Sequence, residues 1–160
     1  MDVGQLEGWY AGHAGALVRF AATLVGAAEA EDLVATVVAD LLRRGAGSSG
    51  PSVEQMDAYM YCAVTLAARK HWRTIGRRAR REAYVARPDR VEFEPGDTQP
   101  EVVALLAGLS PQQRAVIHLT YWDDLTPLAV ADRLGVGEGT VRRQLARARH
   151  RLREVLTDVR

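Results

Sequence analysis

Residues 126–153 carry the pattern that most restricts how this chain can fold. Thr126 can cap a helix that has Pro127 at its first position, where a missing amide hydrogen costs nothing. Gly135 ends that helix. In a second helix, apolar residues recur at intervals of three and four and therefore share one face: Val141, Leu145, Ala148, Leu152 and Val155. The stretch predicts a helix-turn-helix.

The rest of the second helix is rich in arginine. No acidic residue lies between Arg142 and Arg153. A solvated helix face usually mixes both signs of charge, because like charges four residues apart repel. An ordinary amphipathic helix with a solvated basic face is the alternative, but the one-sided charge favours DNA recognition. The arginines flank the apolar stripe on both sides: Arg142, Arg143, Arg147, Arg149, Arg151 and Arg153.

Basic residues are concentrated in two places, although the net charge of the 160-residue chain is only +1. One is the arginine-rich helix. The first forty residues are, by contrast, mostly acidic among their charged groups. One surface should therefore attract nucleic acid while another does not. The second basic block, without an acid, consists of Arg69, Lys70, Arg73, Arg77, Arg78, Arg80 and Arg81.

Several function classes find no support in the composition. The single Cys62 excludes an intramolecular disulfide and a cysteine-based zinc site, and the four histidines show no metal-ligand spacing. No nucleophile and base are arranged for catalysis. A membrane span of about twenty apolar residues and a signal peptide are also missing. We therefore expect a cytoplasmic protein without metal, cofactor, enzymatic activity or membrane insertion.

The N-terminal half predicts a three-helix bundle. Helices are expected at residues 9–25 and 29–44, followed by a loop at 45–52 and a long helix that continues to residue 81. Ser52 and Gln55 fit a capping box for this third helix. Trp72, inside the basic block, can pack on the bundle, contact an unpaired base, or do both. The expected core positions are Leu17, Phe20, Ala21, Leu24, Val25, Leu33, Val34, Val37, Val38, Leu41, Leu42, Met56, Tyr59, Met60, Ala63, Leu66 and Ala67.

An acidic segment, residues 82–100, separates the two halves. Its prolines and glycine break helices, so it predicts a flexible linker, either a plain tether or a segment that follows a path taken by nucleic acid at another stage. Beyond it, Ser110 and Gln113 form a capping-box pattern. Four short helices should make the C-terminal domain, in which Leu128 joins the apolar stripe of the helix-turn-helix and Ala115, Val116, Leu119 and Trp122 pack against it. The expected fold is thus all-α, with domains at 1–81 and 101–160.

This organisation resembles the extracytoplasmic-function sigma factors of bacterial RNA polymerase, which keep only the sigma-two and sigma-four domains. The run LSPQQRAVIHLTYWDDLTPLAVADRLGVGEGTVRRQLARARHRLREVL is similar to the sigma-four domain, and GTVRRQLARAR to its recognition-helix signature. Regulators of the LuxR type share a similar helix-turn-helix, so a free-standing regulator is the alternative. The segment AEDLV at residues 30–34 resembles the family's polymerase-docking helix, which LuxR-type regulators lack.

The resemblance implies roles for particular residues. Arg142, Arg143 and Arg147 would face the major groove at the minus-35 element, with Thr140 and Arg149 on phosphates. Residues 45–52 would form a pocket for a flipped-out base. Docking on the core polymerase would use Glu31, Asp32, Leu33 and Thr36. Contact with the minus-ten element would use Arg69, Lys70, His71, Trp72, Arg73, Arg77 and Arg78.

The same resemblance implies the partners: core RNA polymerase through its clamp coiled coil and flap, promoter DNA in double- and single-stranded form, and an anti-sigma factor. Four positions depart from the family pattern. Ala35 and Thr36 replace a glutamine and an acid, while Leu66 and Lys70 replace an asparagine and an aspartate. We expect these departures to alter details of polymerase docking and minus-ten reading without removing a basic face.

Overall fold

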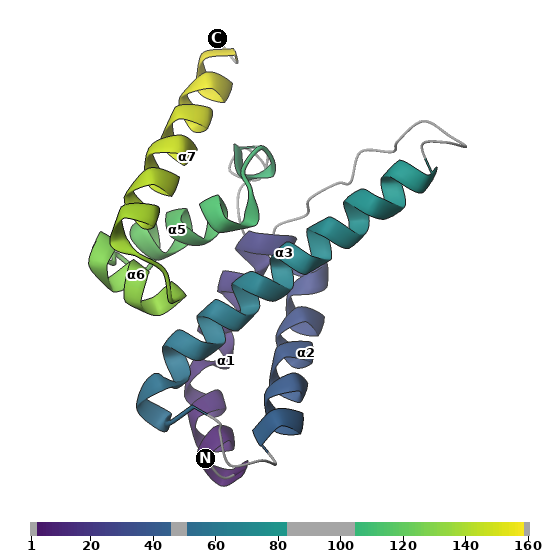
Figure 1. Cartoon of the computed structure of the whole chain (residues 1–160), viewed down its shortest axis with the longest axis vertical. Coiled ribbons are helices and arrows are strands. Elements are labelled where there is room, and N and C mark those ends of the chain that lie inside the picture. The colour runs from purple at the N-terminus through teal and green to yellow at the C-terminus, as the bar shows by residue number, and fades with distance from the viewer. Residues whose placement is uncertain (1–2, 46–50, 83–104, 159–160) are drawn as a thin grey trace.

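The computed structural model describes residues 3–45, 51–82 and 105–158, and every regular element within these ranges is helical. This confirms the predicted all-α class. A further helical turn occupies residues 105–107. In chain order the elements are α1 (Val3–Val25), α2 (Ala27–Gly45), the 3₁₀ turn η1 (Val53–Gln55), α3 (Met56–Glu82), α5 (Pro111–Tyr121), α6 (Pro127–Leu134) and α7 (Glu138–Asp158), as Figure 1 shows.

Helices α1, α2 and α3 form the N-terminal bundle. Gly26 joins α1 to α2 with a backbone φ of 98°, a left-handed conformation that glycine adopts without a steric penalty. The predicted core face of α1 is buried throughout. The helix also starts earlier than predicted, which brings Leu6 into the core, and Trp9 is buried as well.

Helix α3 buries more than one face. The capping box of Ser52 and Gln55 is present, but it opens η1, and α3 begins only at Met56. Leu66 is 54% exposed, so its predicted core position is wrong. Tyr61 and Thr65 are buried instead, because α3 packs against α5 and α6 as well as against α1 and α2. Leu42 on α2 is likewise exposed, against prediction.

The predicted helix-turn-helix is confirmed. The Thr126 hydroxyl accepts a hydrogen bond from the Ala129 amide at the start of α6, and Gly135 ends that helix with a φ of 63°. Two predicted packing positions are wrong, since Leu128 and the Trp122 side chain are more than half exposed. The buried residues of α6 and α7 are Val130, Ala131, Leu134, Val141, Leu145 and Ala148.

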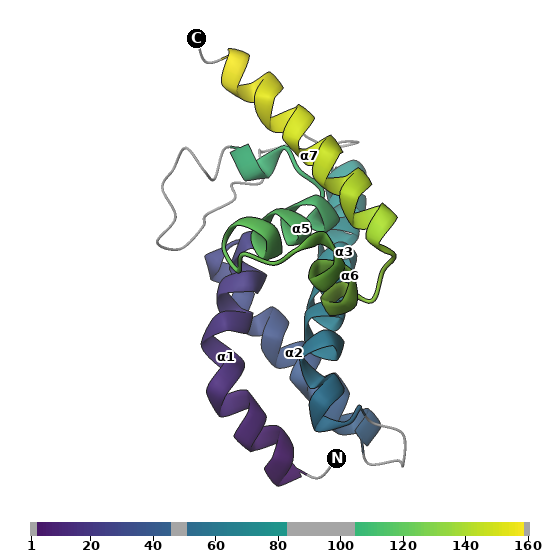
Figure 2. The ribbon, with the colours of Figure 1, turned by 90° about the vertical axis from the view of Figure 1, so that its left-hand side faces the viewer.

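The N-terminal bundle and the C-terminal helices lie in direct contact. Helix α5 packs against α1 and α3, and α6 packs against α3. Both views of the ribbon show these neighbours side by side (Figures 1 and 2). We call this contact surface the seam. The predicted linker lies outside the described residues, as does most of the loop predicted at 45–52. The proposed domain boundaries therefore stay predictions.

Candidate nucleic-acid interface

Helix α7 presents exposed arginines opposite its buried stripe. Arg142 forms an ion pair with Glu138 one turn earlier, its Nε lying 3.0 Å from the carboxylate. A terminal nitrogen of Arg143 lies 3.5 Å from the hydroxyl of Thr140. Arg147 is exposed and pairs with no acid in the described part of the chain. Of the three predicted base-reading arginines, only Arg142 thus has a competing carboxylate among the described residues.

Two other arginines brace α7 against the rest of its domain. Arg149 donates from Nε to the Tyr121 hydroxyl at 2.9 Å, and its guanidinium lies 5.8 Å from the centre of that ring. Arg151 donates to the carbonyl of Gly108 at 2.9 Å. Both side chains remain exposed. The predicted contact of Arg149 with phosphate stays a prediction.

The predicted minus-ten residues fall on two separate faces of α3. Arg69, Arg73 and Arg77 are exposed and spaced one turn apart, and with Trp72 they line a groove of about 660 Å³ that reaches Pro111 at the start of α5. No acid among the residues with described side chains pairs with these three arginines. The groove therefore has a positive wall suited to phosphate.

Lys70 and His71 lie on a second groove of about 510 Å³ between α2 and α3. Arg78 is exposed farther along α3. The sequence run from Arg69 to Arg78 therefore does not form one continuous surface, because residues adjacent in a helix point about 100° apart. The helical period alone separates these two faces, but it does not show what packs on each side.

Trp72 is packed in this arrangement. Its indole nitrogen donates to the Leu24 carbonyl at the end of α1, at 2.9 Å, and the Arg114 guanidinium lies 5.1 Å from its ring centre. The ring is half-buried and still lines the basic groove. The packing role of Trp72 is thus confirmed, while its contact with an unpaired base stays a prediction.

The residues predicted to dock on polymerase lie on the outer side of α2. Glu31, Asp32 and Thr36 are exposed, and the Thr36 hydroxyl donates to the Asp32 carbonyl at 2.8 Å. Leu33 is half-buried and, together with Thr36 and the exposed Leu66, lines the groove between α2 and α3. The four predicted residues thus lie close together on a surface that the seam leaves open.

Arg114 is buried in α5, which the sequence did not indicate. Only 4% of its surface is exposed. It donates to carbonyls of residues 106, 107 and 109 in its own domain and to Leu24 of α1, the last at 2.8 Å. Burial lowers the pKa of the Arg114 guanidinium to about 10. The carbonyls at the end of a helix carry partial negative charge, so the end of α1 helps to accommodate this buried cation.

His118, one turn after Arg114, is also buried at the seam. Its Nδ1 lies 2.7 Å from the hydroxyl of Thr23 on α1, and its ring meets Phe20 edge-on. Desolvation lowers the pKa of His118, with Asp123 opposing and Arg19 adding to that change. Apart from an apolar neighbourhood, nothing in the sequence distinguishes this position.

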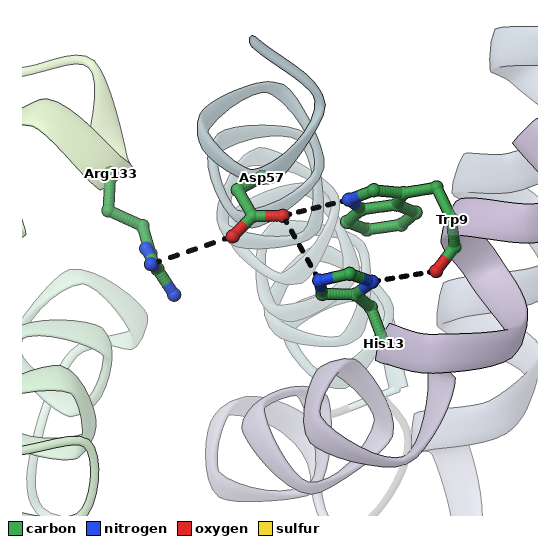
Figure 3. A network of polar contacts seen from close by, with 4 residues as sticks. All are labelled: Trp9, His13, Asp57 and Arg133. Atoms are coloured by element: carbon green, nitrogen blue, oxygen red, sulfur yellow. Dashed lines mark hydrogen bonds and ion pairs between the residues drawn. The ribbon is translucent and has the colours of Figure 1, made fainter. Parts of the chain in front are cut away.

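Asp57, in the first turn of α3, joins three elements (Figure 3). Its carboxylate accepts from the Trp9 indole nitrogen at 2.8 Å and lies 3.7 Å from the ring nitrogen Nε2 of His13. From the other side, Arg133 of α6 approaches its second oxygen at 3.6 Å. The Arg133 guanidinium also lies 4.9 Å from the centre of the Tyr61 ring. An acid in a first helical turn looks ordinary in sequence, so this role was not predicted.

No group of three or more histidine, cysteine or acidic side chains suited to a metal ion occurs among the described residues. Within the same ranges, no helix is both long and apolar enough to cross a lipid bilayer.

Comparison with known proteins identifies the C-terminal helices. The family model of sigma-70 region 4 matches residues 105–154, from the turn before α5 through most of α7. Residues 105–154 are thus similar to sigma-70 region 4. A search of curated protein sequences gave no match.

The solved structures extend the fold assignment beyond the region 4 domain. The sigma factor RpoE from Bartonella quintana, solved in complex with the anti-sigma factor NepR, aligns with 99% of this chain and 100% of its own, at a TM-score of 0.68 and 23% sequence identity. The N-terminal bundle and the region 4 domain together thus have the fold of that sigma factor. This agrees with the predicted pair of helical parts.

Proposed function

We propose that this chain is an extracytoplasmic-function sigma factor that directs core RNA polymerase to promoters with its own minus-ten and minus-35 sequences. The observation that carries the proposal is the region 4 domain attached to a bundle with a second basic face. A free-standing regulator of the LuxR type needs only one DNA-reading surface. Two such surfaces on different helices fit a protein that reads two elements.

At the minus-35 element, Arg142, Arg143 and Arg147 contact base edges in the major groove while Thr140 and Arg149 contact phosphates. Support comes from the exposed arginines in the first half of α7, the part of a recognition helix that reaches base edges. Arginine can bind guanine O6 and N7 in a bidentate manner. Arg142 must first give up its ion pair with Glu138, so Arg147 contributes more to discrimination.

At the minus-ten element, the groove lined by Arg69, Trp72, Arg73 and Arg77 receives the DNA backbone. Its positive wall supports this role. Lys70 and His71 approach the DNA from the other side of α3, next to the polymerase-docking surface of Glu31, Asp32, Leu33 and Thr36. Unpairing of the DNA is then favoured by binding energy alone, without catalytic groups.

The partners follow from the same proposal: the polymerase clamp coiled coil and flap, double- and single-stranded promoter DNA, and an anti-sigma factor. The solved complex of RpoE with NepR supports the last of these. Such a protein works in the cytoplasm. The domains extend over residues 1–81 and 101–160.

Run-off transcription tests the proposal. Purified chain added to core polymerase should give specific transcripts from a cognate promoter, found by mapping transcription starts after induced expression. A regulator of the LuxR type gives none unless another sigma factor is present. Failure to bind core polymerase in a pull-down rules out a sigma factor.

The recognition helix has its own prediction. Arg147→Ala should lose about 1–3 kcal/mol of discrimination between cognate and altered minus-35 DNA, because a bidentate base contact disappears. Fluorescence competition with the two duplexes measures this, and core polymerase binding should be unchanged. Arg153→Ala, farther along α7, serves as the control and should weaken both duplexes equally. Equal weakening by Arg147→Ala would contradict the assigned role.

A further inference from the structure

Glu138, in the first turn of α7, is the only acidic residue in the half of that helix that reaches base edges. The other acids of α7, Glu154 and Asp158, lie at its far end. The Glu138 side chain is partly exposed. A negative charge at this place repels the phosphates that the helix must approach, so its presence needs a physical reason.

The side-chain contacts of Glu138 go to Arg142, one helical turn along. Its carboxylate oxygen Oε1 accepts from Nε of Arg142 at 3.0 Å and also from one of the terminal nitrogens of that guanidinium. The second oxygen, Oε2, pairs with no described side chain. Arg143 lies near the Thr140 hydroxyl, and Arg147 pairs with no acid in the described ranges. Arg142 is therefore the one base-reading arginine that a carboxylate holds.

This ion pair weakens the attraction of Arg142 to DNA of arbitrary sequence. When Arg142 turns to a phosphate, its guanidinium exchanges one oxyanion for another, and Glu138 is left unpaired beside a negatively charged backbone. Such repulsion disfavours the wrong complex without a new attractive contact. Arg142 therefore adds little to binding in general, whereas an arginine without an acidic partner strengthens binding to every sequence.

A G·C base pair compensates both side chains for the opened ion pair. In the major groove, guanine presents the acceptors O6 and N7, which arginine binds in a bidentate manner, and cytosine presents an N4 amino group that glutamate accepts from. Both groups lie on the same edge of one base pair. The tips of Glu138 and Arg142 lie within hydrogen-bond distance of each other, so they can meet this edge together. An A·T pair offers an amino donor but no bidentate pair of acceptors for arginine.

We infer that Glu138 determines specificity: it withholds Arg142 from phosphates and makes this arginine bind where one G·C pair receives both side chains. The inference rests on the proposed function, in which the first half of α7 reads the minus-35 element. It adds the identity of one base pair in that element and the residue that selects it. Discrimination by Arg142 thus depends on Glu138, whereas discrimination by Arg147 does not.

Selection from a randomised pool tests the base preference. Holoenzyme assembled from core polymerase and the full-length chain binds promoter duplexes randomised only in the minus-35 element, and sequencing of the bound fraction gives the preference at each position. The wild type should favour a G·C pair about tenfold at the position whose preference is lost in Arg142→Ala. Glu138→Gln keeps the size of the side chain and removes its charge, and it should lower that preference severalfold while the other positions stay unchanged.

Glu154→Gln is the matched control, because it removes the same charge from α7 at a residue that also faces a basic side chain, His150, one turn away. It should leave every preference unchanged. Both substituted side chains reach solvent, so we expect the variants to fold. The inference is overturned if Glu138→Gln selects the same bases as the wild type with the same preference, or if Arg142→Ala does.

Binding to a duplex of shuffled sequence tests the withheld arginine. By fluorescence anisotropy at low salt, full-length Glu138→Gln should bind this duplex severalfold more tightly than the wild type, with a steeper salt dependence because Arg142 now contacts a phosphate. The same substitution made together with Arg142→Ala should give no gain over Arg142→Ala alone. A gain that is absent, that equals the gain of Glu154→Gln, or that persists without Arg142 contradicts the role of the ion pair.

Run-off transcription separates this inference from the proposed function. Absence of transcripts from the wild-type holoenzyme at every promoter would refute the proposed function and the inference together. Normal transcription combined with an unchanged base preference in Glu138→Gln would refute only the role of Glu138.

Discussion

At the scale of single residues, Arg114 shows how a charged side chain can hold a small domain together. Its guanidinium donates to carbonyls both in the turn before α5 and at the end of α1; of these, the Leu106 and Leu24 carbonyls each accept from one further donor. A buried carbonyl left without a donor costs about 1–3 kcal/mol. Arg114 therefore contributes to stability by donating hydrogen bonds to backbone carbonyls of other residues.

Replacing this side chain should be costly. Arg114→Met keeps the approximate volume and removes the donors, and we expect a decrease of about 2–4 kcal/mol in the free energy of unfolding. Urea denaturation followed by circular dichroism measures it. Arg143→Met, an exposed position on α7, is the control and should change stability by less than about 0.5 kcal/mol. A loss at position 114 no larger than that of the control would contradict the buried role.

His118 predicts a pH dependence of stability. Burial lowers its pKa in the folded chain, so below the ordinary value near 6.5 the unfolded chain binds the proton more readily than the folded one. The free energy of unfolding should therefore fall as the pH drops through 6.5 toward the lower folded pKa, and His118 should add no pH dependence above about 7.5.

Denaturation profiles between pH 5 and 8 measure this slope. His118→Gln should flatten it even though the variant is less stable at every pH, because the proton-binding group is gone. His150→Gln, on the exposed face of α7, should leave it as in the wild type. An unchanged slope in His118→Gln would assign the pH dependence to other groups.

At the scale of elements, the sequence predicted the features that depend only on neighbouring residues. Caps at Ser110 and Thr126, the stop at Gly135 and the apolar stripes of α1 and α7 all follow from spacing and from the few residues that favour helix ends. Each depends only on neighbours within a turn or two, so no knowledge of the fold was needed.

What the sequence did not predict depends on packing between distant segments. The spacing predicts that Leu66 and Trp122 belong to the core, yet both are more than half exposed. Conversely, the sequence does not single out Arg114, His118 and Asp57, because only the folded chain brings their partners to them.

The turn between α6 and α7 gives an element-scale prediction. Gly135→Ala should lower the free energy of unfolding by about 1–2 kcal/mol, because a φ of 63° crowds a Cβ atom against the following carbonyl. Gly12→Ala, inside α1 with open space around it, should instead raise it by about 0.5–1 kcal/mol. Thermal denaturation of the two variants compares them directly. Effects of the same sign would show that backbone conformation at Gly135 is not the cause.

At the scale of the whole molecule, the seam couples two parts that could otherwise unfold separately. Because Arg114, His118 and Arg133 each bind a partner in the bundle, opening either part exposes groups of the other. Coupling of this kind makes unfolding cooperative, with different probes reporting one transition.

We therefore expect urea unfolding of the wild-type chain to give coincident midpoints by tryptophan fluorescence, to which Trp9 and Trp72 of the bundle contribute, and by far-ultraviolet circular dichroism, which reports all helices. Arg133→Asp should separate the two midpoints, since the seam is weakened while each part keeps its own core. Arg153→Asp should leave them coincident. Separate midpoints in the wild type would mean that the parts are energetically independent.

The Leu24 carbonyl accepts two hydrogen bonds, and this affects the surfaces that become exposed when the bundle and the C-terminal helices separate. It accepts from both Trp72 and Arg114, so both of its lone pairs are used while the chain is closed. When Arg114 leaves, a water molecule can take the vacated position, and the same exchange is open to Thr23 and Asp57. After separation, the two surfaces are therefore hydrated at these points and are not wholly apolar. This disfavours aggregation of the separated chains.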